Sequence, residues 1–201
     1  LARIIEKETG SRVIYVAGDL TDPGVVKNIV EEIHSKLGPI DILVNNAGGD
    51  IGVLGVEAPR AGKPEKNDAV FIPLEDLRKI LDRNLLTCIY ACREVVPEMI
   101  QRKQGVIVNI GSISGLVGLP ESAIYATAKA AVHEYTRCLA VMLRPYGIRA
   151  NVVAPGDTVT ERFKASRPLE EGRLKTTGSL ERYGWPQEIA RTVDFLISDA
   201  S

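Results

Sequence analysis

Residues 40–48 read Ile-Asp-Ile-Leu-Val-Asn-Asn-Ala-Gly, an almost continuous apolar run that ends in small and polar residues. Residues 106–112, Val-Ile-Val-Asn-Ile-Gly-Ser, repeat this pattern. Short apolar runs without strict alternation are typical of strands that are covered on both faces, as in a parallel sheet. Two similar β-branched runs occur elsewhere in the chain. The sequence therefore predicts strands at residues 12–16, 40–44, 106–110 and 148–153.

Longer segments with a helical spacing of apolar residues separate these runs, at residues 23–37, 74–102 and 123–143. Asp22-Pro23 is a typical helix start and Gly38-Pro39 a typical helix end. Alternation of strands and helices predicts βαβ units and an α/β fold with a doubly wound parallel sheet. Because no linker or internal repeat divides the chain, we expect a single domain over residues 1–201.

The composition excludes several classes of protein. The 201 residues include 25 Lys and Arg and 26 Asp and Glu, which gives a net charge of −1. A protein that binds nucleic acid through the phosphate backbone usually has a basic excess, so we expect no nucleic-acid partner. No apolar run reaches the length of a membrane span, so we expect no membrane role. The three cysteines are too few for a disulfide scaffold and favour a reducing cytoplasm.

Tyr125 and Lys129 are four residues apart on a predicted helix, so both side chains project from one face. A nearby ammonium group stabilises a phenolate and lowers the pKa of the tyrosine. A tyrosine with a lowered pKa can exchange a proton with an alcohol or carbonyl oxygen near neutral pH. Taken alone, however, this spacing most often marks an ordinary pair on a helix surface.

Other polar residues follow the predicted strands, at the carboxyl ends where open α/β sheets bind ligands. Ser112 follows residues 106–110, residues 45–48 follow 40–44, and residues 155–160 follow 148–153. Each of these segments is also consistent with simple turn chemistry. Asn84 lies among leucines in a long helical segment, where it could hold a water molecule or face solvent.

Together, these motifs resemble the classical short-chain dehydrogenase/reductase family. The matching residues are Asp19-Leu20-Thr21, Asn45-Asn46-Ala47-Gly48, Asn84, Ser112, Tyr125 with Lys129, Pro155-Gly156 with Thr160, and Arg182-Tyr183-Gly184-Trp185-Pro186 before Glu188. The resemblance implies a Rossmann-like, three-layer α/β/α fold. It also implies an oxidoreductase that uses NAD or NADP to interconvert a secondary alcohol and a ketone, without a metal ion.

The resemblance also implies a role for each matching residue. Tyr125 would be the general acid and base, and Lys129 would lower its pKa and bind the nicotinamide ribose. Ser112 would position the substrate carbonyl, and Asn84 would hold a water molecule that links Lys129 to solvent. The cofactor would also contact residues at several strand ends. These residues are Asp19 and Leu20 at the adenine end, Asn45, Ala47 and Gly48 beneath the cofactor, and Pro155, Gly156, Thr158 and Thr160 beside the nicotinamide.

The match to the family is incomplete at both ends. The sequence contains no Thr-Gly-x-x-x-Gly-x-Gly phosphate loop, and the family's C-terminal motifs are absent. In the family's sheet, the first two strands lie between the strands that correspond to residues 12–16 and 40–44. Because these two strands are missing here, the segments would be separated by roughly 10 Å of empty sheet. We therefore expect the working protein to be longer than these residues. A true fragment of this length would not bind a dinucleotide normally.

Several alternatives remain open from the sequence. The chain could be a catalytically silent cofactor-binding or scaffold homologue, a truncated inactive fragment, or a lyase or epimerase of the related extended family. Among oxidoreductases, it looks most like 3-oxoacyl-carrier-protein reductases and sugar or polyol dehydrogenases. The resemblance further implies a homo-oligomer, a dimer or tetramer, built on the helices at residues 84–102 and 123–143.

The sequence leaves the roles of two charged segments open. Residues 49–73 form a long connection at the rim of the expected site, and a solvated face is the favoured interpretation of their charges. Arg162, Lys164 and Arg167 could meet an anionic substrate or simply face solvent. Cys88, Cys92 and His133 lack the clustering of a zinc site, so packing in the core or at an interface is the favoured interpretation for them.

Overall fold

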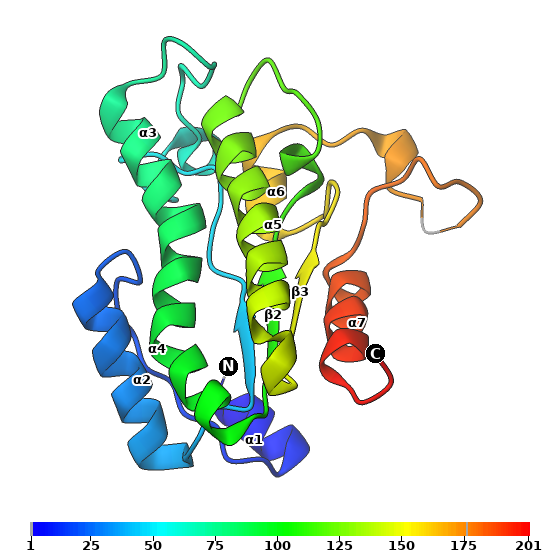
Figure 1. Cartoon of the computed structure of the whole chain (residues 1–201). Helices are drawn as coiled ribbons and strands as arrows, with labels where there is room; N and C mark the ends of the chain where they lie inside the picture. Colours follow the sequence, from blue (N-terminus) through cyan, green and yellow to red (C-terminus); the bar gives the residue numbers. More distant parts are fainter. Residues whose placement is uncertain (1, 176) are drawn as a thin grey trace.

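The computed structural model describes residues 2–175 and 177–201 (Figure 1). Three parallel strands form one sheet in the order β1-β2-β3. The central strand β2 aligns Val106 with Ile42 of β1 and with Arg149 of β3. The strands are β1 (Ile42–Asn45), β2 (Val106–Ile110) and β3 (Arg149–Val153). The parallel α/β architecture predicted from the sequence is thus confirmed.

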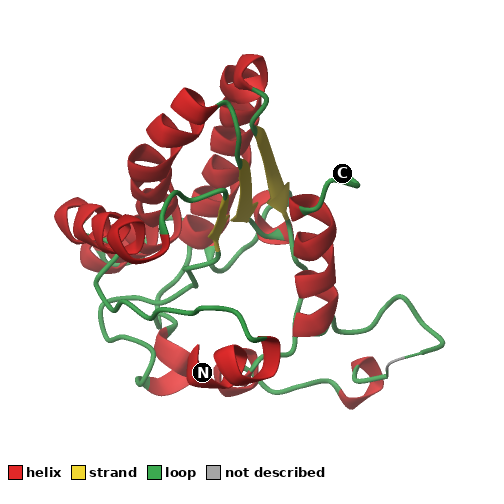
Figure 2. Ribbon diagram, turned by 90° about the horizontal axis from the view of Figure 1, so that it is seen from below, coloured by secondary structure: helices red, strands yellow, loops and turns green. Residues whose placement is uncertain are grey.

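Helices cover both faces of this sheet (Figure 2). On one face, α4 packs against β1 and α5 packs against β3, while α2 lies on the outer side of α4. On the other face, α7 packs against β2 and β3. The α-helices are α1 (Ala2–Thr9), α2 (Pro23–Leu37), α3 (Leu74–Leu81), α4 (Thr87–Arg102), α5 (Ala123–Leu143), α6 (Glu161–Ser166) and α7 (Pro186–Ile197). Shorter helical turns are η1 (Pro59–Gly62), η2 (Asp82–Leu86), η3 (Ile113–Gly115), η4 (Arg144–Tyr146) and η5 (Glu171–Arg173).

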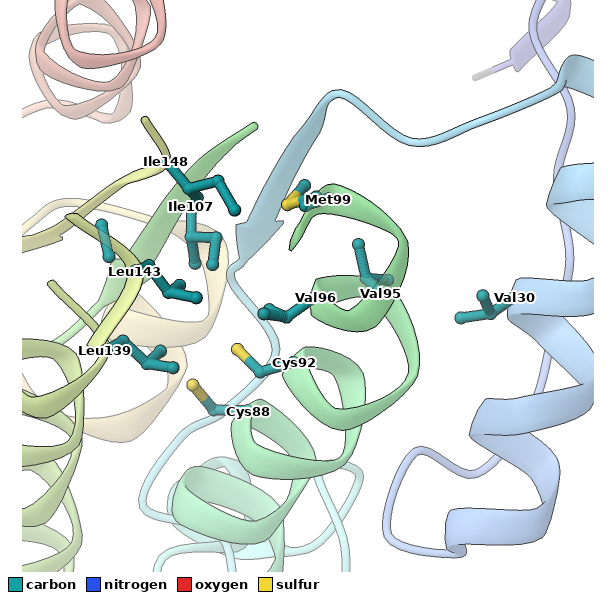
Figure 3. Packing of buried hydrophobic residues seen from close by; sticks show 11 residues of the cluster. Val30, Cys88, Cys92, Val95, Val96, Met99, Ile107, Leu139, Leu143 and Ile148 are labelled. Atoms are coloured by element: carbon teal, nitrogen blue, oxygen red, sulfur yellow. The ribbon is translucent and has the colours of Figure 1, made fainter. Parts of the chain in front are cut away.

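The hydrophobic core lies between the sheet and the helices α4 and α5 (Figure 3). Ile107 of β2, Met99 of α4 and Leu143 of α5 are fully buried at its centre. Cys88 and Cys92 also belong to this core, as expected from the sequence. The burial of apolar side chains from all three elements fixes the position of β2 relative to α5.

The strand predicted at residues 12–16 is wrong for this structure. No described strand lies beside this segment, and Tyr15 within it is 80% exposed. A β-strand depends on ladder hydrogen bonds to a neighbour, so β propensity alone does not produce one. The other three predicted strands form, although β1 begins at Ile42 instead of Ile40.

The predicted helix boundaries hold where capping interactions fix them. Asp22 accepts a hydrogen bond from the backbone N–H of Gly24 at 2.7 Å, and Pro23 begins α2. Gly38 ends α2 with a positive φ of 90° and donates its N–H to the carbonyl of His34. The segment predicted at residues 74–102 is helical throughout, but it contains a π-turn over Asp82–Leu86. Among the described residues, no helix is both long and apolar enough to cross a membrane.

Candidate active site

A cavity of about 680 Å³ opens at the carboxyl ends of the three strands. Eight of the residues predicted for the site line it: Gly48, Ser112, Tyr125, Lys129, Pro155, Gly156, Thr158 and Thr160. They come from the segments after β1, β2 and β3 and from the first turns of α5. Parallel strands end at the same edge of a sheet, so residues far apart in the sequence meet here.

Ser112 follows β2 and is held from both sides. Its backbone N–H donates a hydrogen bond to Nε2 of His133 at 3.3 Å, and its Oγ accepts one from the N–H of Ser114 at 3.1 Å. His133 is buried one helical turn beyond Lys129, and burial lowers its pKa. A neutral imidazole is required for Nε2 to accept this bond. His133 is therefore a positioning residue for Ser112, and its spacing from Lys129 was the available sequence signal.

Tyr125 lies half-buried in the cavity wall, and burial raises its pKa above the ordinary value. A hydrogen bond with Ser112 acts in the opposite direction and is the main influence that lowers this pKa. The sequence predicted that Lys129 would lower it. In the structure, Lys129 Nζ lies 5.8 Å from the centre of the tyrosine ring, and burial, not Lys129, has the largest influence on the pKa of Tyr125. The predicted direction of the Tyr125 pKa shift is therefore wrong, because burial dominates.

Lys129 is only 4% exposed, and its Nζ donates a hydrogen bond to the carbonyl of Ile110 at 2.8 Å. Burial lowers its pKa to about 8, so most of it is still protonated at neutral pH. An ammonium group has three hydrogens, and the bond to Ile110 uses one of them. Lys129 can therefore still donate to a ligand in the cavity.

Asn84 is buried in the π-turn between α3 and α4, where its side chain holds the loop after β1. Its Oδ1 accepts from the N–H of Gly49 at 2.7 Å, and its Nδ2 donates to the carbonyls of Gly49 and Ile80. Both amide hydrogens are thus used. A relay water, as predicted for Asn84, would have to donate to the remaining lone pair of Oδ1. A methyl group at Gly48 would lie 2.8 Å from this Oδ1 and 3.3 Å from Lys129 Nζ, so glycine is needed at position 48.

Four other predicted site residues lie outside the cavity lining. Asn45 donates to Oδ1 of Asn109 at 2.8 Å and thereby joins β1 to β2. Ala47 follows it and does not line the cavity. Asp19 is exposed, and its hydrogen bonds from Thr21 lower its pKa. Neither Asp19 nor Leu20 lines the cavity or the second hollow described next.

A second hollow of about 570 Å³ lies between the strand ends and α7. Its apolar wall includes Ile189 and Val193 of α7 and Val44 of β1. It shares Asn46, Ile110, Pro155, Thr158 and Thr160 with the first cavity. The two hollows therefore form neighbouring parts of one site, with the hydroxyls of Thr158 and Thr160 on the shared side and the Lys129 ammonium in the first cavity. An apolar wall beside such hydrogen-bond donors suits a flat aromatic ring joined to a hydroxylated sugar.

The comparisons with known proteins agree with this geometry. A family model described as short chain dehydrogenase matches residues 1–171. Cyclohexanol dehydrogenase from Rhodococcus sp. is 33% identical over 198 residues, which cover 97% of this chain and 70% of that protein. The solved structure titled "ElxO with NADP Bound" is 28% identical, with a TM-score of 0.80. The match covers 98% of this chain and 77% of the ElxO chain. The structure of a 3-oxoacyl-acyl-carrier-protein reductase with bound NAD from Brucella melitensis is 28% identical, with a TM-score of 0.78. The match covers 100% of this chain and 71% of the Brucella chain.

The chain belongs to the short-chain dehydrogenase family. It is an oxidoreductase of the NAD- or NADP-dependent type, with the Rossmann-like fold that the sequence predicted. The buried lysine, the threonine hydroxyls and the glycine-lined approach described above fit a nicotinamide nucleotide. Among the described residues, no group of three or more His, Cys, Asp or Glu side chains is placed to hold a metal ion.

Proposed function

We propose that this protein interconverts a secondary alcohol and a ketone, with Ser112, Tyr125 and Lys129 as its catalytic residues. The observation that carries the proposal is that these three side chains meet in one cavity at the carboxyl ends of the strands. Their roles follow from chemistry as well as from family membership. Each of them offers a proton or a hydrogen bond to an oxygen atom bound between them.

In the reducing direction, a ketone gains a hydride at carbon and a proton at oxygen, and the products are the alcohol and the oxidised cofactor. The nicotinamide, when bound, supplies the hydride and accepts it in the reverse reaction. Tyr125 donates the proton to the carbonyl oxygen. Its raised pKa supports this role because the phenol stays protonated at neutral pH.

Ser112 and Lys129 support this proton transfer. The Ser112 hydroxyl, which lines the same cavity as Tyr125, holds the substrate oxygen against the phenol. Lys129 donates to the ribose hydroxyls, and its positive charge stabilises negative charge that develops on Tyr125 as the proton leaves. Asn84 acts on the site through the loop at Gly49, whose backbone it holds with two hydrogen bonds.

The cofactor site in this proposal comprises Gly48, Tyr125, Lys129, Pro155, Gly156, Thr158 and Thr160, with Asn45 and Ala47 behind it. Thr160 also caps the N-terminus of α6, where its Oγ1 accepts from the N–H of Phe163 at 3.1 Å. Contact of Asp19 and Leu20 with the adenine stays a prediction. Because these two residues are outside both hollows, a bound adenine would extend beyond them.

Replacing Tyr125 with phenylalanine tests the proposal. The variant should reduce ketones about a hundredfold to ten-thousandfold more slowly, because general acid catalysis typically contributes that much. Cofactor affinity, measured by fluorescence titration, should be retained. Tyr135→Phe on the same helix is the matched control, since Tyr135 packs against the core outside the cavity. Equal rates for Tyr125→Phe and the control would refute the mechanism, and no turnover by any variant would favour a catalytically silent homologue.

We further propose that the 201 residues form one domain of a homo-oligomer in a reducing cytoplasm. Val141 and Met142 of α5 are 77% and 52% exposed, which supports burial of this helix against another copy. The three cysteines, Cys88, Cys92 and Cys138, are all free thiols. Light scattering of the purified protein should give the mass of a dimer or tetramer, and a monomer would contradict this part of the proposal.

A further inference from the structure

Arg162 of α6 reaches into the cavity that Ser112 and Tyr125 line. Its Nη2 donates a hydrogen bond to the backbone carbonyl of Asp50 at 3.0 Å. The guanidinium group lies against Gly49, where a methyl group would come within 3.2 Å of both Cζ and Nη1. Gly49 has a φ of +142°, so glycine at this position both adopts the required backbone and leaves room for the arginine.

The neighbouring cations already have carboxylate partners. Lys164, one of the three basic residues considered from the sequence, pairs with Glu161 at 2.7 Å on the solvent side of α6. Arg167 pairs with Asp157 at 3.8 Å. Lys63 is enclosed between Asp50 at 3.9 Å and Glu121 at 3.6 Å, which contradicts the expectation of a fully solvated loop.

Arg162, in contrast, makes no ion pair with any carboxylate in residues 2–175 and 177–201, and its Nε is buried without a hydrogen-bond partner. The charge of the nearby Asp50 is shared with Lys63, and Asn67 donates to its Oδ2 at 2.8 Å. Burial lowers the pKa of Arg162, and the attraction of Asp50 only partly opposes this effect. A partly buried cation without a carboxylate partner is unfavourable unless a ligand supplies the missing negative charge.

We propose that Arg162 binds an anionic group of the substrate, so that the preferred substrates are oxo acids and the corresponding hydroxy acids. A planar guanidinium group suits a carboxylate because it can donate two parallel hydrogen bonds. This inference rests on the proposed function, because it places the substrate carbonyl at Ser112 and Tyr125. A cofactor phosphate has similar chemistry. We assign the anion to the substrate because Arg162 lines the cavity with Tyr125 but does not line the second hollow beside α7.

The test compares oxo acids with their methyl esters, which differ in charge at nearly constant shape. Three acids cover different spacings between carbonyl and carboxylate: 2-oxobutanoate, acetoacetate and levulinate. The protein should reduce at least one acid about tenfold to a hundredfold more efficiently, in kcat/KM, than its ester, as expected for a charge-assisted hydrogen bond. Arg162→Met should remove this preference, and Arg162→Lys should retain part of it. Lys164→Met, on the same helix but facing solvent, should leave it unchanged.

Calorimetric titration of the same acids tests the inference independently of turnover. Binding of an acid to the protein with oxidised cofactor present should weaken in Arg162→Met and stay the same in Lys164→Met. Gly49→Ala, which displaces the guanidinium without removing it, should also weaken binding. Equal binding by the protein and Arg162→Met would overturn the inference, even if ketones are reduced. Arg162→Met could instead bind the cofactor more weakly while the ratio of kcat/KM for the acid to kcat/KM for its ester stays unchanged. This result would assign Arg162 to a cofactor phosphate and would also overturn the inference.

Discussion

Replacing Lys129 with methionine should make the cofactor-free protein more stable at neutral pH while it abolishes catalysis. Lys129 is 4% exposed, and burial lowers its pKa to about 8. The folded protein therefore binds the lysine proton more weakly than the unfolded chain does, whose lysine titrates near pH ~10.4. The charged lysine thus lowers the free energy of unfolding at pH below about 8, and this cost disappears as the pH rises toward about 10.

The size of this effect follows from the two pKa values. A lysine pKa that falls to about 8 on folding corresponds to roughly 3 kcal/mol of destabilisation at neutral pH. Methionine removes this cost but leaves the carbonyl of Ile110 without its hydrogen bond, which offsets about 1 kcal/mol. We therefore expect Lys129→Met to raise the free energy of unfolding by about 2 kcal/mol near neutral pH.

Urea unfolding, followed through the fluorescence of Trp185, measures this difference. Comparing the protein with Lys129→Met cancels the titration of all other groups. The stability of the protein relative to the variant should increase by about 2 kcal/mol between roughly pH 7 and pH 9.5. A difference that does not change over this pH range would show that Lys129 has an ordinary pKa and would refute the reasoning.

Two further substitutions test the contacts that position the site. In Gly111→Ala, the added methyl group would lie 2.2 Å from Nε2 of His133, so the imidazole and Ser112 must move. We expect kcat to fall about a hundredfold while cofactor binding is retained, and an unchanged kcat would contradict the role of His133. Asn84→Ala removes three hydrogen bonds of a buried side chain and should lower the free energy of unfolding by about 2–4 kcal/mol in urea titrations. Asn28→Ala, at an exposed position of α2, should have little effect, and equal losses for the two would refute the role of Asn84.

The sequence predicted the fold well where local signals and burial agree. Three apolar runs became the parallel strands, and Asp22 and Gly38 marked the ends of α2. The run at residues 12–16 has the same composition, but it forms no strand because ladder pairing depends on a neighbour and not on the segment itself. The π-turn around Asn84 was also beyond prediction, since Asn84 bonds to Gly49, 35 positions earlier in the sequence.

The candidate site was predictable in its residue types but not in its electrostatics. Spacing alone placed Tyr125 and Lys129 on one helix face, and the strand ends placed Ser112 beside them. The pKa of Tyr125 was predicted in the wrong direction because burial is a property of the whole fold. Arg162 and Lys164 are two residues apart and look alike in the sequence. Only the packing of α6 against η1 turns one into the cavity and leaves the other in solvent.

Hydride transfer between the cofactor and a carbonyl carbon can be tested by following a deuterium label from the reduced cofactor to the product. Reduced NAD and NADP deuterated at the transferring nicotinamide position would be mixed with the protein and the panel of oxo acids and esters. We expect an alcohol that carries one deuterium on its carbinol carbon, detected by mass spectrometry, and little such product from Tyr125→Phe. Cofactor consumption without deuterium in the alcohol, or equal labelling by Tyr125→Phe, would contradict this expectation.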